Sequence, residues 1–216
     1  MMKMRAKSIC LEHNSFNYIK QQKILYLLIG ILFVGGVICG SFCVNSLGVA
    51  QKEGLATYLS NFFQGLDEGG IVDPQTSLKY SIGEHLKIMG LIWLLGLSMI
   101  GIPLILGFIF LKGMFLGFNI GFLFSQFSWQ GFWFAFVSLV PQNLLIIPIY
   151  IIIAVAGINF ATSLVVNRLI YHRGEIYPRF LTFSFLAIGG VPVLILVSIF
   201  QAYISPILMK CTLPIT

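Results

Sequence analysis

The stretch ILYLLIGILFVGGVICGSFCV, residues 24 to 44, is apolar over nearly its whole length. As an α-helix it would extend about 30 Å, which matches the hydrocarbon core of a bilayer. It is longer than the apolar core of a cleaved signal peptide, so we expect an uncleaved anchor. A basic segment, residues 1–23, precedes it and carries Lys3, Arg5, Lys7, Lys20 and Lys23. This pattern predicts a first span, 24–44, that follows a cytoplasmic N-terminal segment.

The overall composition agrees with a membrane protein. Of the 216 residues, 58% are hydrophobic and only 9% are charged, and the apolar residues form long blocks between short polar ones. A water-soluble protein of this size needs more charged surface. The net charge of +6 comes from scattered Lys and Arg residues rather than from a basic stripe, which argues against nucleic acid as a partner. We expect one membrane domain, residues 1–216.

Residues 45–87 form the longest polar stretch, and acidic residues outnumber basic ones there. The positive-inside rule predicts that this stretch is an extracytoplasmic loop. One helical face within it gathers large apolar side chains, the candidate partner-docking residues Leu55, Tyr58, Leu59, Phe62 and Phe63. This amphipathic helix either lies on the outer membrane surface or docks an extracytoplasmic partner, and the sequence leaves both alternatives open.

The next apolar block runs from residue 88 to 111 and ends at Lys112. It is long enough to span the membrane, whereas the following segment, 113–127, falls short of about 30 Å. We therefore expect a second span followed by a short, tilted or re-entrant helix. An alternative breaks the chain near Gly101 and Pro103 and places Lys112 inside the next helix.

Three glycines, Gly113, Gly117 and Gly121, repeat every four residues in this short segment. Such a stripe leaves one helix face without side chains, so that a second helix backbone can approach closely. We expect helix packing within the chain, with a subunit interface as the alternative.

The later part of the central hydrophobic core, 88–166, contains Pro141, Gln142 and Asn143. Because the apolar run is too long for one simple span, we expect a kinked or broken helix at these three residues. Two amide side chains at membrane depth need hydrogen-bond partners, so this is the candidate intramembrane polar site. The amides either repair a broken backbone or line a polar path.

The remaining sequence completes the predicted topology. Residues 167–179 are rich in arginine and should form a cytoplasmic loop, and residues 180–204 make a last span. The predicted fold is an all-α, polytopic membrane helix bundle with about five transmembrane helices, kinked or re-entrant segments and a cytoplasmic N-terminus. Four or six crossings are the alternatives.

No constellation typical of an enzyme is visible in the sequence. His13, His85 and His172 are far apart, and no nucleophile or acid recurs beside them at a catalytic or metal-ligand spacing. The four cysteines also lack such spacing. We expect no enzymatic activity, no cofactor and no bound metal. The main alternative from another class is a transporter or permease-like subunit, suggested by the short third segment and the break near Pro141.

Ordered motifs then suggest a family. They are VNS at 44–46, QKE at 51–53, YLSNFF at 58–63, GLIWLLGLSMIGIPLI at 90–105, KGM at 112–114, GFWFAFVSLVPQN at 131–143 and AYISPILMK at 202–210. In this order they resemble the stage II sporulation protein M family, over nearly the whole chain after about residue 24. Broader relatives have His-Gly where this chain has Gln142 and Asn143, so the site fits the sporulation branch better.

The resemblance implies a multi-pass cell-membrane protein on the mother-cell side of the sporulation septum. It implies a non-enzymatic scaffold of the septal peptidoglycan-degrading complex, which is required for engulfment of the forespore during endospore formation. The partners implied are membrane lipids and two peptidoglycan-degrading proteins, sporulation proteins D and P of stage II. A homo-oligomer is left open.

Overall fold

The computed structural model describes residues 2–67, 73–98, 100–165 and 176–211, with side chains from residue 23 onward except at a few positions beside the gaps. Within these ranges the chain is helical and forms no strand, which confirms the predicted all-α class. The α-helices are α1 (Met2–Cys43), α2 (Val49–Asp67), α3 (Pro74–Gly96), α4 (Gly101–Val165), α5 (Ile176–Ile199) and α6 (Ser205–Cys211). A short 3₁₀ turn, Val44–Ser46, follows α1, and a π-helical turn, Phe200–Ile204, joins α5 to α6.

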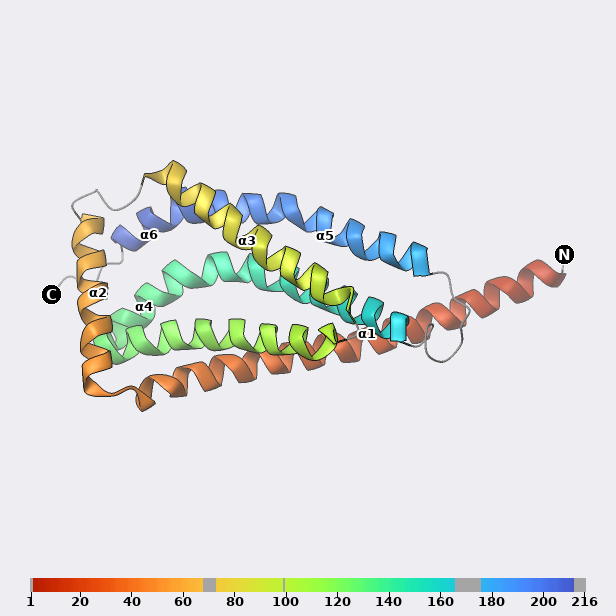
Figure 1. Ribbon diagram of the computed structural model, residues 1–216, viewed down its shortest axis with the longest axis horizontal. Helices are drawn as coiled ribbons and strands as arrows, with labels where there is room; N and C mark the ends of the chain where they lie inside the picture. The colour runs from red at the N-terminus through yellow and green to blue at the C-terminus, as the bar shows by residue number, and fades with distance from the viewer. Residues whose placement is uncertain (1, 68–72, 99, 166–175, 212–216) are drawn as a thin grey trace.

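Helix α4 is two helices joined at a single residue. Ser128 has φ 50° and ψ −130°, the only non-helical backbone inside the 65-residue element. This residue reverses the chain, so the first half (101–127) and the second half (129–165) lie side by side in opposite directions (Figure 1). Neighbouring Trp129 and Gln130 are both exposed at this hairpin tip.

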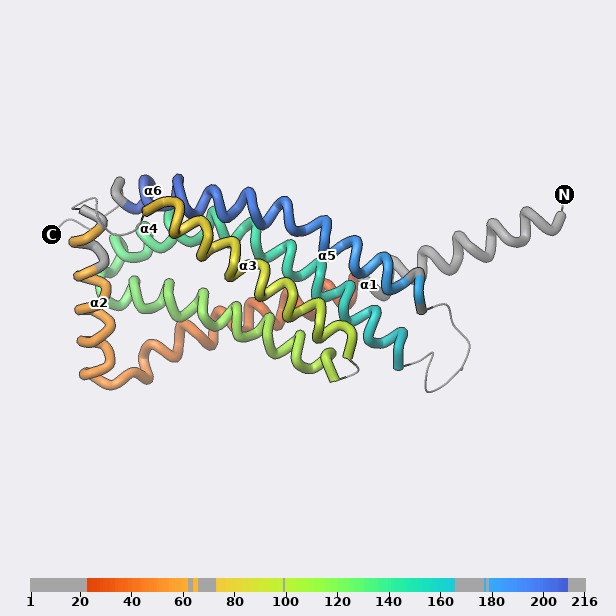
Figure 2. The backbone as a smooth tube through the Cα atoms, turned by 45° about the horizontal axis from the view of Figure 1, so that its top comes forward, coloured from red at the N-terminus to blue at the C-terminus, as the bar shows by residue number. Residues whose placement is uncertain are grey.

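The elements form a bundle with one helix across its end. α1, α3, the two halves of α4, and α5 all run roughly along the long axis, whereas α2 lies crosswise over the end that contains the hairpin tip and α6 (Figures 1 and 2). The predicted amphipathic helix is therefore present as α2. It is a cap on the bundle rather than a continuation of it.

Among the described residues, three stretches are long and apolar enough to cross a membrane: Lys23–Ser46, Gly101–Val165 and Arg179–Met209. Their outward faces carry large apolar side chains, such as Ile31, Phe115 and Leu196, which are more than half exposed. Water would oppose so much exposed apolar surface, whereas lipid tails accept it. The fold is that of a membrane protein.

The main apolar core lies where α3, α4 and α5 meet. Ile92, Ile105 and Ile153 are almost completely buried there. The rings of Phe160 and Phe183 stack with their centroids 5.7 Å apart. This core fixes α3 and α5 against the second half of α4.

Two expected boundaries are wrong. The stretch 45–87 is not one polar loop, because α3 begins at Pro74. The charged residues Lys79, Glu84 and Lys87 therefore belong to a helix that packs in the bundle. The expected helix end at Lys112 is also wrong, since the chain breaks between Gly96 and Gly101 and Lys112 lies well inside α4. The alternative break near Gly101 is the one found. Pro103 is accommodated in the first turn of α4, where its missing N–H has no intrahelical partner to lose.

Candidate functional site

A polar cavity lies inside the bundle, between α3, both halves of α4 and the π-helical turn. Its volume is about 140 Å³. Apolar side chains from α1 and α4 close part of the wall, and the polar side chains that line it are Glu84, His85, Lys112, Gln142, Asn143, Tyr150 and Gln201. Polar groups at this depth are expensive in a membrane protein and usually serve a function.

Glu84 and Lys112 provide opposite charges on one side of the cavity. The Lys112 ammonium nitrogen lies 3.8 Å from a Glu84 carboxylate oxygen. Lys112 is about 16 Å along α4 from Gly101 and about 24 Å from Ser128, which is near the middle of the first half of the helix. A single charge at the centre of a spanning helix costs about 2.5–3.5 kcal/mol or more, so each of these ions depends on the other.

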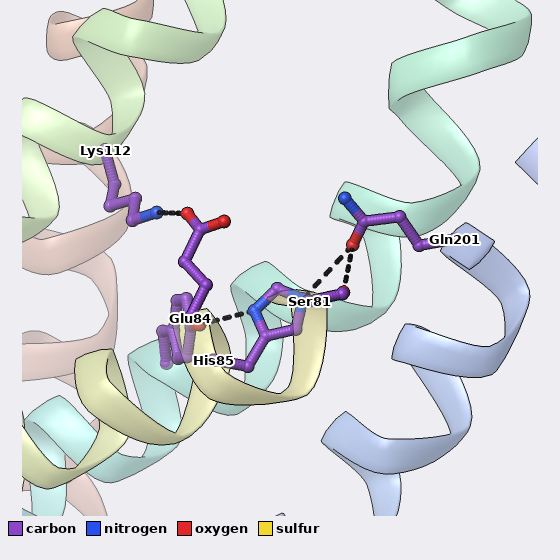
Figure 3. A network of polar contacts seen from close by, with 6 residues as sticks. Ser81, Glu84, His85, Lys112 and Gln201 are labelled. Atoms are coloured by element: carbon purple, nitrogen blue, oxygen red, sulfur yellow. Dashed lines mark hydrogen bonds and ion pairs between the residues drawn. The ribbon is translucent and has the colours of Figure 1, made fainter. Parts of the chain in front are cut away.

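A hydrogen-bonded network occupies the other side of the cavity (Figure 3). The Ser81 hydroxyl donates to Oε1 of Gln201 at 2.8 Å, and Nε2 of His85 lies 3.3 Å from the same oxygen. Nδ1 of His85 lies 2.9 Å from the Tyr150 hydroxyl oxygen. Since an amide oxygen only accepts, Nε2 of His85 is the protonated nitrogen, and Tyr150 then donates to Nδ1 of a neutral imidazole. The network ties α3 to α4 and to the π-helical turn.

Gln142 and Asn143 reach the cavity from the second half of α4, which stays helical through Pro141. A broken helix at these three residues is therefore wrong, and the non-helical residue is Ser128 instead, while a kink at Pro141 stays a prediction. The Asn143 amide nitrogen donates to the Leu139 carbonyl at 2.8 Å within its own helix. Gln142 is 7% exposed, and its Oε1 has no hydrogen-bond partner among the described residues.

The glycine stripe lies on a different face of α4. Gly113, Gly117 and Gly121 contact the α1 backbone and side chains around Phe33, Val37 and Ser41, and a Cβ atom at Gly113 or Gly117 would overlap an α1 carbonyl oxygen. Two glycines of α1 return the contact: Gly36 faces the Phe110 carbonyl, and Gly40 faces the Met114 carbonyl. The stripe thus lies at a helix contact within the chain. The two backbones are closer together than any side chain at these positions would allow.

On the apolar face of α2, some side chains pack against the bundle and others are exposed. Leu55 and Leu59 are half-buried, and Leu59 packs against Leu123 and Phe134 beside the hairpin tip. Tyr58 is 72% exposed. The side chains of Phe62 and Phe63 lie outside the described residues.

Sequence reasoning missed most of the cavity. The sequence predicts an external loop for Glu84 and His85 and a helix end at Lys112, and it indicates no role for Tyr150 or Gln201. One local signal was available, because Ser81 and His85 are four residues apart and share a helix face. The pairing of Glu84 with Lys112 has no such local signal.

Apolar helices of spanning length around an internal polar cavity define the class as an integral membrane protein of the helical type. Among the described residues, no group of His, Cys, Asp and Glu side chains is arranged to hold a metal ion. The family model of stage II sporulation protein M matches residues 29–206, and the chain belongs to this family. No curated protein and no solved structure matches the chain.

Proposed function

We propose that this sporulation membrane protein is a non-enzymatic, multi-pass scaffold of the septal peptidoglycan-degrading complex that engulfment of the forespore requires. It would act in the mother-cell membrane and hold sporulation proteins D and P of stage II, which carry the hydrolytic chemistry. Support comes from the family to which the chain belongs and from the cap that α2 makes on the bundle.

The proposed topology has five crossings: α1, α3, the two halves of α4, and α5 continued by α6. Their alternating directions put the start of α1, the end of α4 and the start of α5 on one side of the membrane, next to the N-terminal segment and the sequence between α4 and α5. Both segments are basic, with Lys20 and Lys23 in one and Arg168 and Arg173 in the other, so this side is cytoplasmic. At the opposite end, Trp129 and Trp133 are 71% and 60% exposed, as is typical of side chains at a membrane interface.

The position of α2 is the observation that carries the scaffold proposal. A helix that crosses the ends of spanning helices lies in the plane of the membrane, on its outer side in this topology, where wall-degrading proteins work. Leu59 anchors it to the hairpin tip, while Tyr58 stays exposed beside it. Exposed tyrosines are frequent at protein interfaces because they add contact area with little loss of side-chain entropy.

The test is to purify the tagged protein from sporulating cells in mild detergent and measure the amounts of D and P recovered. Changing Tyr58→Ala should lower their recovery and the peptidoglycan hydrolysis of the eluate. Tyr177→Ala is the matched control, since Tyr177 is 70% exposed on α5 near the other end of the bundle. Equal recovery with both variants would count against docking through α2, and absence of both partners from the wild-type eluate would count against the scaffold itself.

A transporter or permease-like subunit is the second candidate function. The short third segment that first suggested it does not exist, because the first half of α4 runs from 101 to 127. The polar cavity now favours this candidate. Solute flux into liposomes, compared between the wild type and the double variant Gln142→Leu and Asn143→Ala, tests it, and absence of flux in the wild type would rule it out.

A further inference from the structure

The cavity contains polar atoms whose bonding capacity the protein does not use. The 3.8 Å between Lys112 and Glu84 is an ion-pair contact but too long for a hydrogen bond, so ammonium protons and carboxylate lone pairs remain available. Gln142 is 7% exposed, and its Oε1 has no hydrogen-bond partner among the described residues. A buried acceptor of this kind carries a desolvation cost unless something donates to it.

The arrangement of these atoms separates acceptors from donors. Acceptor oxygens come from Glu84 and Gln142, and the strongest donor is Lys112. The Gln201 oxygen is already held by Ser81 and His85, and Figure 3 shows the Gln201 amide nitrogen turned away from these two residues, while Gln201 lines the same cavity as Glu84 and Lys112. The cavity therefore offers partners both to a donor and to an acceptor.

This charge pattern selects against simple ions. A lone cation meets the Lys112 ammonium, and a lone anion meets the Glu84 carboxylate, and such contacts between like charges are unfavourable. A molecule with both signs can place each charge beside its opposite. The volume of about 140 Å³ is close to that of cavities known to hold a benzene molecule, so the ligand has roughly six non-hydrogen atoms.

We propose that this cavity is a binding site for a small zwitterion that carries an ammonium group and an acid group. The ammonium donates to the Glu84 carboxylate and to Oε1 of Gln142. The acid group accepts from the Lys112 ammonium and the Gln201 amide. This binding activity is separate from the scaffold role and does not depend on it.

The test uses the full-length protein in nanodiscs of phosphatidylglycerol, a lipid whose headgroup contains no ammonium group, with radiolabelled glycine and β-alanine as probes. Saturable binding of at least one probe is expected, at one molecule per chain. Methylamine and acetate, which carry only one of the two charges, should compete at least about tenfold more weakly, because each loses one charged contact. If neither probe binds saturably, or if methylamine or acetate competes equally well, the proposal is overturned.

Variants locate the site. Lys112→Met and Glu84→Gln should each weaken binding about tenfold or more, since each removes a charge-assisted hydrogen bond. Gln142→Leu should also weaken it and leaves the ion pair in place, so it separates binding from folding. Matched controls are Lys87→Met on α3 and Glu53→Gln on α2, both outside the cavity lining and exposed. Unchanged binding in a folded Gln142→Leu variant would overturn the assignment to this cavity.

A second arm identifies the source of the zwitterion. Phosphatidylethanolamine has the same pair of charges in its headgroup, so nanodiscs that contain it should show reduced glycine binding if the membrane itself supplies the ligand. Undiminished glycine binding in these nanodiscs would assign the site to a free solute. Either result supports a site for a zwitterion.

Discussion

Two neighbouring residues of α4, Lys112 and Gly113, face opposite kinds of environment. Gly113 lies against α1, where glycines on both helices let the backbones meet without side chains between them. Lys112 lines the cavity, where polar side chains join α3 to α4 and to the π-helical turn through an ion pair and hydrogen bonds. One face is tight and apolar, and the other is open and polar. In a bilayer, where lipid tails are as apolar as leucine, close packing and polar contacts are the two available ways of joining helices.

The tight face should be the more sensitive to substitution. Gly117→Leu should destabilise the protein by about 3 kcal/mol or more, because its Cβ atom would overlap the Val37 carbonyl oxygen and α1 has no room to retreat without losing the whole contact. The thermal unfolding midpoint of the purified protein in mild detergent measures the effect. Gly107→Ala is the control on the same helix, since nothing lies within 4 Å of a Cβ atom there. Helix propensity alone would stabilise both variants, so a Gly117→Leu variant as stable as Gly107→Ala would mean that the contact with α1 does not decide stability.

The ion pair should give the next largest effect. Lys112→Met should cost about 1–2 kcal/mol by leaving Glu84 unpaired, less than for a fully buried pair because the two side chains are 32% and 47% exposed. The double variant Lys112→Met with Glu84→Gln should lose less than the sum of the single losses. A thermodynamic cycle from unfolding in bicelles measures this coupling. Strict additivity would show that the two charges do not stabilise each other.

The hydrogen-bonded network should contribute less. Tyr150→Phe removes the hydroxyl that donates to His85 and should cost about 1 kcal/mol. Tyr203→Phe, at a tyrosine that is 45% exposed, provides the control for loss of a hydroxyl. Both variants can be compared by their unfolding midpoints. No difference between them would indicate that the His85 contact adds no stability.

Gln142→Leu should have the smallest effect on stability, within about 0.5 kcal/mol of the wild type or slightly favourable. The reason is that the change removes a buried acceptor with no protein partner and replaces it with an apolar side chain of similar size. The measurement is again the unfolding midpoint, taken without added solutes. A loss above about 1 kcal/mol would reveal a bond to Gln142 within the protein.

The parts of the fold that sequence predicted are those set by local pattern. The apolar run 24–44 gave the spanning part of α1, and the one-sided distribution of Leu55, Tyr58 and Leu59 gave α2. Hydropathy acts residue by residue along one helix, so a single sequence is enough to read it.

The parts that sequence reasoning got wrong depend on contacts between distant segments. Glu84 looked like a loop residue because its charge was counted alone, whereas in the fold Lys112 offsets it from another helix. Pro141 looked like a break, yet the helix continues through it and the chain reverses at Ser128, in a stretch where Ser128 to Gly131 are mostly small or polar. Charge compensation and tolerance of proline are decided by neighbours that no local rule includes.

The single-residue reversal at Ser128 also affects how the chain enters the membrane. Only one non-helical residue separates the two halves of α4. This connection is too short to let one half insert into the membrane while the other half stays outside it. We therefore expect the two halves to enter the membrane together as a helical hairpin, after Glu84 has already been synthesised. During synthesis, Glu84 is therefore present before Lys112, the residue whose charge it compensates.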